Sequence, residues 1–142
     1  MKDEAFEQKN IFGTGQENNA FAQFFIGKSY LKPLTSPEEC GLLFANVTFE
    51  PGCRNNWHIH HAKKGGGQIL LCIAGEGWYQ EWGKDARSLA PGDVVVIPAG
   101  VKHWHGAKKD SWFSHIAVEV PGEDRSNEWL EAVTDETYMR LR

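Results

Sequence analysis

Two histidines spaced two residues apart, His58 and His60, are the side chains of this sequence with the clearest capacity for chemistry. If their segment is a β-strand, both imidazoles point to the same face, because side chains alternate along a strand. Two imidazoles on one face can bind a common ion, and imidazole is a frequent ligand of first-row transition metals. Taken alone, the pair is more typical of exposed histidines on an edge strand, so a metal site requires further ligands.

Two more polar side chains qualify as those ligands. Gln68 opens an otherwise apolar, strand-like segment. His103 follows a turn that Pro98 and Gly100 impose, which places it on the strand that leaves the turn. A single histidine is more often an exposed or hydrogen-bonded structural residue, but these two residues and the first pair together predict one joint metal site.

The predicted ligands, His58, His60, Gln68 and His103, are three neutral imidazoles and one neutral amide. They leave a divalent ion with its full positive charge, which makes the ion a stronger Lewis acid and a good host for an anionic substrate oxygen. Four protein ligands leave about two positions open on an octahedral ion, which suits manganese, iron, cobalt or nickel. Zinc is less suited, because it usually settles at four ligands.

Short apolar segments separated by turns must position these side chains. Between residues 42 and 122, turn residues recur about every 8–12 residues, which is typical of an all-β sandwich or barrel. Residues 127–134 and 135–141 then look helical, with Asn127 and Thr134 as N-caps that are followed by acidic residues. The predicted fold class is therefore all-β with a short helical C-terminus.

The chain has the length of one domain. Residues 1–20 are polar and contain glycine, which predicts a flexible N-terminal arm, or one that orders only against a partner chain. The single domain then spans residues 21–142. Residues 21–34 favour an extended strand, and together with the exposed edges of a barrel they predict a homodimer formed by strand addition.

Composition narrows the partners and the compartment. The net charge is −4, and no apolar run approaches the roughly 20 residues that span a bilayer, so neither nucleic acid nor a membrane is expected as a partner. The N-terminus is acidic and has no apolar signal segment. The three cysteines, Cys40, Cys53 and Cys72, fit no zinc-binding spacing and indicate reduced thiols in a cytoplasmic protein. A small-molecule substrate is the expected partner.

Two motifs make the chain similar to the cupin family. The first, G-x5-H-x-H-x3–4-E-x6-G, is matched in order by Gly52, His58, His60, Gln68 and Gly75. The chain departs from it because glutamine replaces glutamate and because the gap before this residue is longer than usual. The second, G-x5-P-x-G-x2-H-x3-N, is matched by Gly92, Pro98, Gly100 and His103, with Ala107 in place of asparagine. The resemblance implies a double-stranded β-helix, which is a jelly-roll-like barrel.

A narrower resemblance covers about residues 24–141. Residues 47–52, 102–107 and 133–136 are similar to small bacterial cupins that include manganese-dependent hydroxynitrile lyases and relatives resembling carboxymuconolactone decarboxylase. Members of this group use His, His, Gln and His as metal ligands, which suits Gln68. The resemblance implies manganese as the first choice of metal, with iron, nickel, cobalt or zinc as alternatives.

The same resemblance implies roles for residues outside the metal site. His115 falls where the lyases carry a histidine acid/base, and Ala45, Val47 and Glu119 fall along their substrate pocket. Glu119 departs from the glutamine that the lyases carry nearby. Phe113 shares a strand face with His115 and Glu119, so it is expected in the wall of the pocket or in the core.

Proton transfer has two candidate residues. His115 suits this role because imidazole titrates near neutral pH, although it could equally be a buried histidine bonded to a backbone carbonyl. His105 is the competing candidate, either as the acid/base or as a residue that orients the ligands. His61 faces away from the His60 side of its strand and is expected to be exposed.

These features predict a metal-dependent lyase or decarboxylase that combines Lewis-acid catalysis with a histidine acid/base. Two alternatives come from other functional classes. One is a metal-binding sensor or storage cupin without turnover. The other is an iron(II)-dependent dioxygenase, in which the open metal positions activate oxygen.

Overall fold

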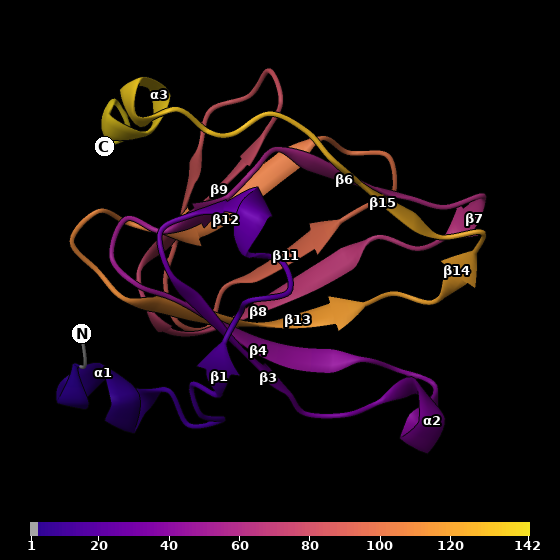
Figure 1. The fold of residues 1–142 in the computed structure, drawn as a ribbon. Coiled ribbons are helices and arrows are strands. Elements are labelled where there is room, and N and C mark those ends of the chain that lie inside the picture. The colour runs from indigo at the N-terminus through magenta and orange to yellow at the C-terminus, as the bar shows by residue number, and fades with distance from the viewer. Residues whose placement is uncertain (1–2) are drawn as a thin grey trace.

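Two curled antiparallel sheets face each other in this computed structural model, which describes residues 3–142 (Figure 1). The first sheet has the order β1 (Gln16–Glu17), β3 (Ser29–Pro33), β4 (Phe44–Phe49), β13 (Phe113–Glu119), β8 (Gln68–Gly75) and β11 (Val94–Ile97). The second has the order β10 (Arg87–Leu89), β9 (Gly77–Glu81), β12 (His103–Ala107), β5 (Arg54–Asn55) and β2 (Phe25–Ile26). In the same sheet, β6 (His58–His61) pairs with β12 and with β15 (Ser126–Trp129). The predicted all-β, jelly-roll-like barrel is confirmed.

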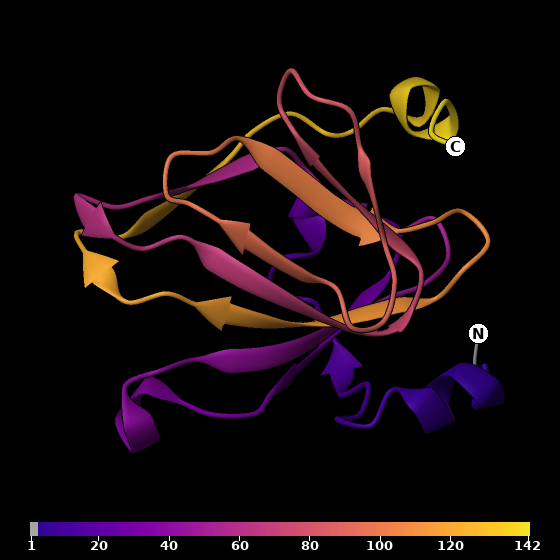
Figure 2. The same ribbon diagram turned by 180° about the vertical axis from the view of Figure 1, so that it is seen from behind.

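Smaller elements flank the barrel. Strands β7 (Lys64–Gly65) and β14 (Gly122–Glu123) pair in a projection at one end of the molecule, opposite the end where the N-terminus and α3 lie (Figure 1). The helices are α1 (Glu4–Lys9), the 3-10 helix η1 (Ala22–Phe24), α2 (Pro37–Cys40) and α3 (Asp135–Met139). Seen from behind, β11 and β8 lie side by side along one wall of the barrel (Figure 2).

Strand β8 has one face inside the barrel and one face outside. Its side chains alternate, so that Leu70 and Cys72 are buried inside while Ile69 and Leu71 are half-buried on the outer face. The strand ends at Gly75, whose φ of +73° favours glycine, and an added Cβ there would overlap the carbonyl oxygen of Trp112. The final glycine of the first motif is therefore a steric requirement.

The C-terminal region is helical only in part. The predicted helix over residues 127–134 is wrong, because Ser126–Trp129 forms strand β15 and pairs with β6. Backbone hydrogen bonds to a neighbouring strand outweigh the local helical signals of this segment. The second predicted helix is confirmed as α3, and the Thr134 side chain caps it by accepting a hydrogen bond from the backbone nitrogen of Thr137.

The N-terminal residues fold against the barrel instead of extending as an arm. Helix α1 buries Phe6, whose ring lies 5.6 Å from that of Trp112. The Asn10 side chain is buried too: it donates to Thr48 Oγ1 at 3.0 Å and accepts from Asn46 Nδ2 at 2.8 Å, both on β4. The arm predicted over residues 1–20 is corrected from Asp3 onward, and its first two residues lie outside the described part of the chain.

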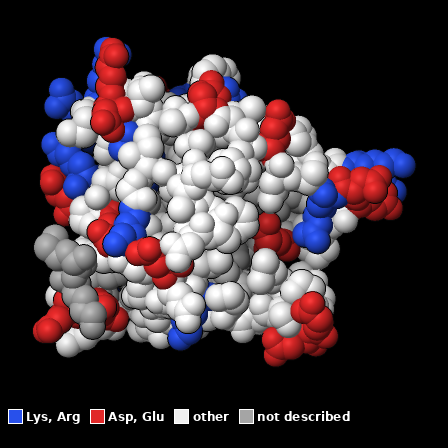
Figure 3. Space-filling model, viewed as in Figure 1, with Lys and Arg blue, Asp and Glu red and all other residues white. Residues whose placement is uncertain are grey.

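Positive and negative side chains are mixed on the face of the molecule drawn in Figure 3. Within residues 3–142, no helix has both the length and the apolar character needed to cross a membrane. On the face drawn in Figure 3, Lys and Arg are interspersed with Asp and Glu at the periphery, and the centre carries few charged side chains. This face therefore carries no basic patch of the kind that binds nucleic acid.

Candidate metal site and adjoining cavity

Three histidines from two neighbouring strands meet inside the barrel. His58 and His60 are buried on the same face of β6, and His103 lies directly opposite His58 on β12. The His58 ring centroid is 4.2 Å from that of His103 and 5.1 Å from that of His60. His61 points the other way and is exposed, as expected, and its Nε2 lies 2.8 Å from Glu128 Oε1. The structure thus brings the histidines of the two motifs together.

Each of these three rings has its Nδ1 occupied by an oxygen acceptor. The partners are the carbonyl of Asn56 for His58 at 2.8 Å, the carbonyl of Val101 for His103 at 2.9 Å, and Asn127 Oδ1 for His60 at 2.8 Å. An acceptor at Nδ1 places the proton on that nitrogen and leaves Nε2 with a free lone pair. Metal-binding histidines commonly have this arrangement, which fixes both tautomer and ring orientation.

Unpartnered buried atoms test whether the residues fit a cation. Six buried side-chain polar atoms lack a hydrogen-bond partner among residues 3–142, and three of them are His60 Nε2, His103 Nε2 and Gln68 Oε1. Each such atom costs about 1–3 kcal/mol if nothing binds it. Three lone-pair donors of this kind in one region fit a metal ion.

A second grouping of histidines includes His105. Ligand atoms of His58, His103 and His105 lie within 4.8 Å of one another, so these three histidines are positioned to bind a metal ion. The His105 ring is also engaged elsewhere, because its Nδ1 lies 3.1 Å from His115 Nε2. His60 is absent from this grouping, although its free Nε2 is available. The two possible ligand sets therefore share His58 and His103 and differ in the rest.

Burial lowers the pKa of His58, His103, His105 and His115 and keeps these four imidazoles neutral. It lowers the pKa of His103 to about 4 and that of His115 to about 3. Burial is also the first cause that holds the pKa of His58 and of His105 well below the ordinary value, and neighbouring histidines add to the effect. Neutral imidazole is the form that binds metals and accepts protons, but the expectation that His115 titrates near neutral pH is wrong for the metal-free protein, because burial disfavours its charged form.

Metal-free protein is expected to lose stability on acidification from pH 7 to pH 5. The unfolded chain protonates histidine near pH 6.5, whereas folded His103 and His115 do so only at about 4 and about 3. The unfolded state therefore binds more protons in this window, and each of these histidines removes about 2 kcal/mol of the free energy of unfolding between pH 7 and pH 5, with the slope approaching about 1.4 kcal/mol per pH unit below pH 6.5. Urea unfolding at several pH values in a chelator measures the effect. A free energy of unfolding that stays constant over the window contradicts it.

A mostly apolar cavity of about 230 Å³ adjoins the histidines. Phe25, Leu31 and Trp129 form part of its wall, and the predicted pocket residues Ala45 and Val47 line it as well. The polar side chains in the wall are Asn18, Asn55, His58, His60, Gln68, His105, His115, Glu119 and Asn127. The cavity is thus mostly apolar by surface, with polar side chains among its lining residues.

Phe113 is absent from this wall. It is fully buried in the core, where its ring centroid lies 5.9 Å from that of Phe49 and 5.6 Å from that of His115. The expectation that Phe113 lines the pocket is therefore corrected, and the alternative core position holds. Its ring supports His115 from the core.

His105 and His115 form a buried pair beside the cavity. His115 Nε2 and His105 Nδ1 are 3.1 Å apart, so one nitrogen donates and the other accepts. Asn55 holds His105 through a hydrogen bond from the His105 backbone nitrogen to Asn55 Oδ1, at 2.9 Å. The pair can hold one shared proton close to the cavity.

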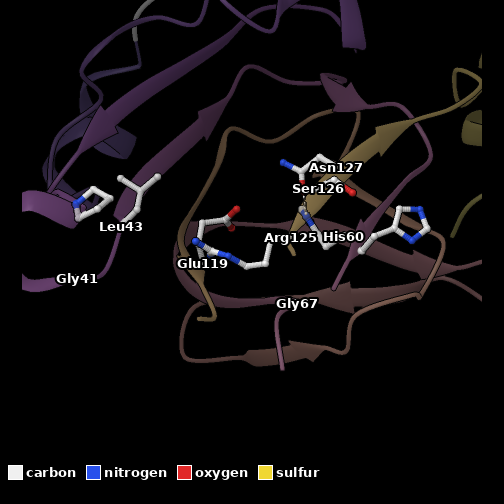
Figure 4. A pocket seen from close by; sticks show the side chains of 10 residues that line it. Gly41, Leu43, His60, Gly67, Glu119, Arg125, Ser126 and Asn127 are labelled. Atoms are coloured by element: carbon white, nitrogen blue, oxygen red, sulfur yellow. Dashed lines mark hydrogen bonds between the residues drawn. The ribbon is translucent and has the colours of Figure 1, made fainter. Parts of the chain in front are cut away.

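A second, more polar pocket of about 280 Å³ lies on the outer side of the cavity. Figure 4 shows Leu43, His60, Glu119 and Asn127 along its wall, and these four residues also line the inner cavity. Arg125 lines the outer pocket as well. A small molecule can therefore meet polar side chains before it reaches the apolar chamber.

Sequence reasoning missed two residues of the site, Asn127 and Trp129. On β15 they lie opposite His60 and His58 respectively, and the Trp129 ring stacks on His58 with centroids 4.6 Å apart. Asn127 and Trp129 are two residues apart, so on a strand they would share one face, and this spacing was the one local sign of a strand. Nothing local in the sequence identifies β6 as its partner.

Comparison with known proteins agrees with this geometry. Residues 45–118 match the model of the cupin domain. An (R)-mandelonitrile lyase from Granulicella tundricola is 40% identical over 120 residues, which cover 84% of this chain and 88% of that protein. A cupin-like protein from Thermotoga maritima, known from its crystal structure, is also 40% identical, with 92% of this chain and 96% of that chain covered and a TM-score of 0.79.

A more distant structure shares the fold alone. A cupin 2 conserved barrel domain protein from Rhodopseudomonas palustris is 17% identical, with 89% of this chain and 81% of that chain covered and a TM-score of 0.66. Together with the two motifs, the barrel and the facing histidines, these similarities show that the chain belongs to the cupin family.

Proposed function

We propose that this cupin is a metal-dependent lyase that cleaves a carbon–carbon bond in a small hydroxynitrile or a related carbonyl adduct. One observation carries the proposal: the buried His105–His115 pair adjoins an apolar cavity whose wall also carries candidate metal ligands. The relative from Granulicella tundricola, an (R)-mandelonitrile lyase, supports this class of reaction.

We assign the metal to His58, His60, Gln68 and His103. His60 and Gln68 are preferred to His105 because they offer buried lone pairs without a partner, whereas His105 already contacts His115. The assignment favours manganese first, with iron, nickel, cobalt or zinc as alternatives. When bound, the metal supplies Lewis acidity to a substrate oxygen or to cyanide.

The apolar wall binds the organic part of the substrate. Phe25, Leu31, Val47 and Trp129 offer aromatic and aliphatic contacts for an aryl or branched alkyl group. The substrate carbon that carries the hydroxyl and nitrile groups then points toward His105 and His115. The apolar walls lower the polarity around the bound substrate, which strengthens its electrostatic interactions.

The histidine pair moves the proton. Neutral His115 accepts the substrate hydroxyl proton as the carbon–oxygen bond becomes a carbonyl and the carbon–carbon bond to cyanide breaks. Cyanide leaves with the bonding electron pair and takes the proton back, which restores neutral His115. His105, 3.1 Å from His115 Nε2, holds the ring in position and is the alternative proton acceptor.

Loading the metal-free protein separately with manganese and iron tests this function against its alternatives. Cyanohydrin cleavage with manganese, followed as release of the aldehyde, supports the lyase. Oxygen uptake that occurs only with iron supports the dioxygenase instead. Tight metal binding without turnover of either kind supports a binding role.

We also propose that the chain forms a homodimer through the outer face of the first sheet. Within residues 21–34, β3 already pairs on both sides with β1 and β4, whereas β2 pairs only with β5 and stays at a sheet edge, so strand addition there remains a second possible route. On edge strand β11, however, Val94 and Val96 are 51% and 66% exposed. Val94 lies beside Leu71 of β8, and Val96 beside Ile69 of the same strand, which makes a flat aliphatic surface with an open edge.

Sedimentation measures this assembly. The wild-type chain is expected at about 32 kDa, twice its 16.0 kDa, and Val96→Asp is expected to return it to the monomer mass because a charge disrupts the aliphatic face. Met139→Asp, at an exposed apolar residue of α3, is the matched control and should stay dimeric. A wild-type monomer at micromolar concentration refutes the dimer.

We place the protein in the cytoplasm. Its three cysteines are free, with Cys53 and Cys72 buried and Cys40 exposed. Burial raises the pKa of the Cys53 and Cys72 thiols to about 12, so both are unreactive. A reducing compartment suits a chain with this set of thiols.

A further inference from the structure

Glu119 reaches the candidate metal site through Gln68. The two residues lie directly opposite each other on β13 and β8, and Gln68 Nε2 donates to Glu119 Oε2 at 2.6 Å. An ionised carboxylate can only accept, so it holds the NH₂ end of the amide on its own side. Gln68 Oε1 is thereby turned away from Glu119, and it is buried without a partner among residues 3–142.

We propose that Glu119 is a positioning residue for the metal, and that through Gln68 it supplies the negative charge that the ligands themselves lack. The proposal rests on the metal site assigned above. Glu119 was expected only in the wall of the pocket, and it does line both the cavity and the outer pocket (Figure 4). Its contact with Gln68 adds a second role.

The hydrogen-bond partners of the four assigned ligands show why the charge matters. The Nδ1 protons of His58 and His103 are accepted by neutral backbone carbonyls, and that of His60 by the neutral amide of Asn127. Of the four partners, only Glu119 is an acidic side chain. Three imidazoles and one amide leave a divalent ion with its whole charge, so this carboxylate is the one that balances part of it.

Two physical effects follow from the 2.6 Å hydrogen bond. First, it fixes the amide so that Oε1, not the NH₂ group, is presented as a ligand. Second, a carboxylate that accepts from the amide polarises it and makes Oε1 more electron-rich, while its charge attracts the cation in a medium less polar than water. Positioning and charge can be separated by substitution.

Metal affinity, measured for Mn(II) and Co(II) by competition with a chromophoric chelator, tests the inference. Glu119→Gln keeps an acceptor for the Gln68 amide but removes the charge, so we expect about 10-fold weaker binding. Glu119→Ala removes charge and acceptor, and its loss should be larger, up to about 100-fold. The double variant Gln68→Glu/Glu119→Gln moves the carboxylate onto the ligand and should restore affinity to within a few-fold of wild type.

Glu123→Gln is the matched control, because it removes the same charge from an exposed residue of β14. Its affinity should equal that of wild type. Wild-type affinity in Glu119→Gln overturns the role of charge, and so does a double variant that binds as weakly as Glu119→Gln. Far-ultraviolet circular dichroism and urea unfolding identify variants that lose affinity only because they misfold. If a single variant misfolds, the metal affinity of the double variant decides whether the charge of Glu119 matters.

Turnover separates this inference from the proposed lyase activity. If affinity depends on Glu119 as expected but no cyanohydrin is cleaved, the lyase proposal fails and the role of Glu119 stands. If cleavage proceeds with manganese but affinity is the same in all variants, the role of Glu119 fails and the lyase stands.

Discussion

Replacement of His115 by alanine is expected to slow cyanohydrin cleavage by about 10²- to 10⁴-fold while the bound metal is retained. The reason is that, in the proposed mechanism, His115 accepts the substrate proton and returns it to cyanide, whereas it is not among the assigned metal ligands. Its ring is fully buried, and its Nε2 lies 3.1 Å from His105 Nδ1. Turnover is measured as aldehyde release, and metal content by elemental analysis of the same protein sample.

Alanine also leaves a void in a packed region, so a second variant is needed. His115→Gln keeps a polar side chain that can hydrogen-bond to His105 but cannot transfer a proton, and it should be as inactive as His115→Ala. His61→Ala, at the exposed histidine of β6, should keep full activity. If His115→Gln is active, His115 is not the acid/base, and loss of activity in His105→Gln with metal retained then assigns the role to His105.

Replacement of His103 by alanine is expected to weaken metal binding by at least about 100-fold and to remove turnover with it. His103 belongs to both possible ligand sets, and its buried Nε2 has no partner among the described residues. Elemental analysis after dialysis and chelator competition measure the loss. Retention of metal at the wild-type level would falsify the placement of the site.

The same measurement decides between the two ligand sets. If His60 and Gln68 are ligands, His60→Ala loses the metal and His105→Ala retains it. If the trio that includes His105 is the site, the outcome is reversed. His61→Ala again serves as the control, because it removes a neighbouring imidazole that faces outward.

The barrel and much of the site could be predicted from local patterns. Histidines two residues apart on a strand share a face, and the turn at Pro98 and Gly100 places His103 at the start of the next strand. Short-range geometry was therefore enough to predict that these residues are candidate ligands. The face shared by His115 and Glu119 followed from the same alternation. Each of these inferences needed only the period of a strand and the position of a turn.

What escaped prediction depends on partners distant in sequence. Asn127 was expected to cap a helix, because its local signals favour that state, whereas pairing of β15 with β6 makes it a strand residue bonded to His60. Asn10 was placed in a flexible arm, yet it satisfies the polar side chains of Asn46 and Thr48. In both cases, a long-range hydrogen bond that no local pattern encodes determines the structure.

The position of β15 also has a consequence for how the protein matures. Asn127 supplies the acceptor that orients His60, and Trp129 covers His58, but both residues lie 67 or more positions later in the chain. During synthesis, the two histidines emerge long before the side chains that orient and shield them. We therefore expect tight metal binding only after β15 has been synthesised, and a nascent chain halted before residue 126 should bind metal only weakly.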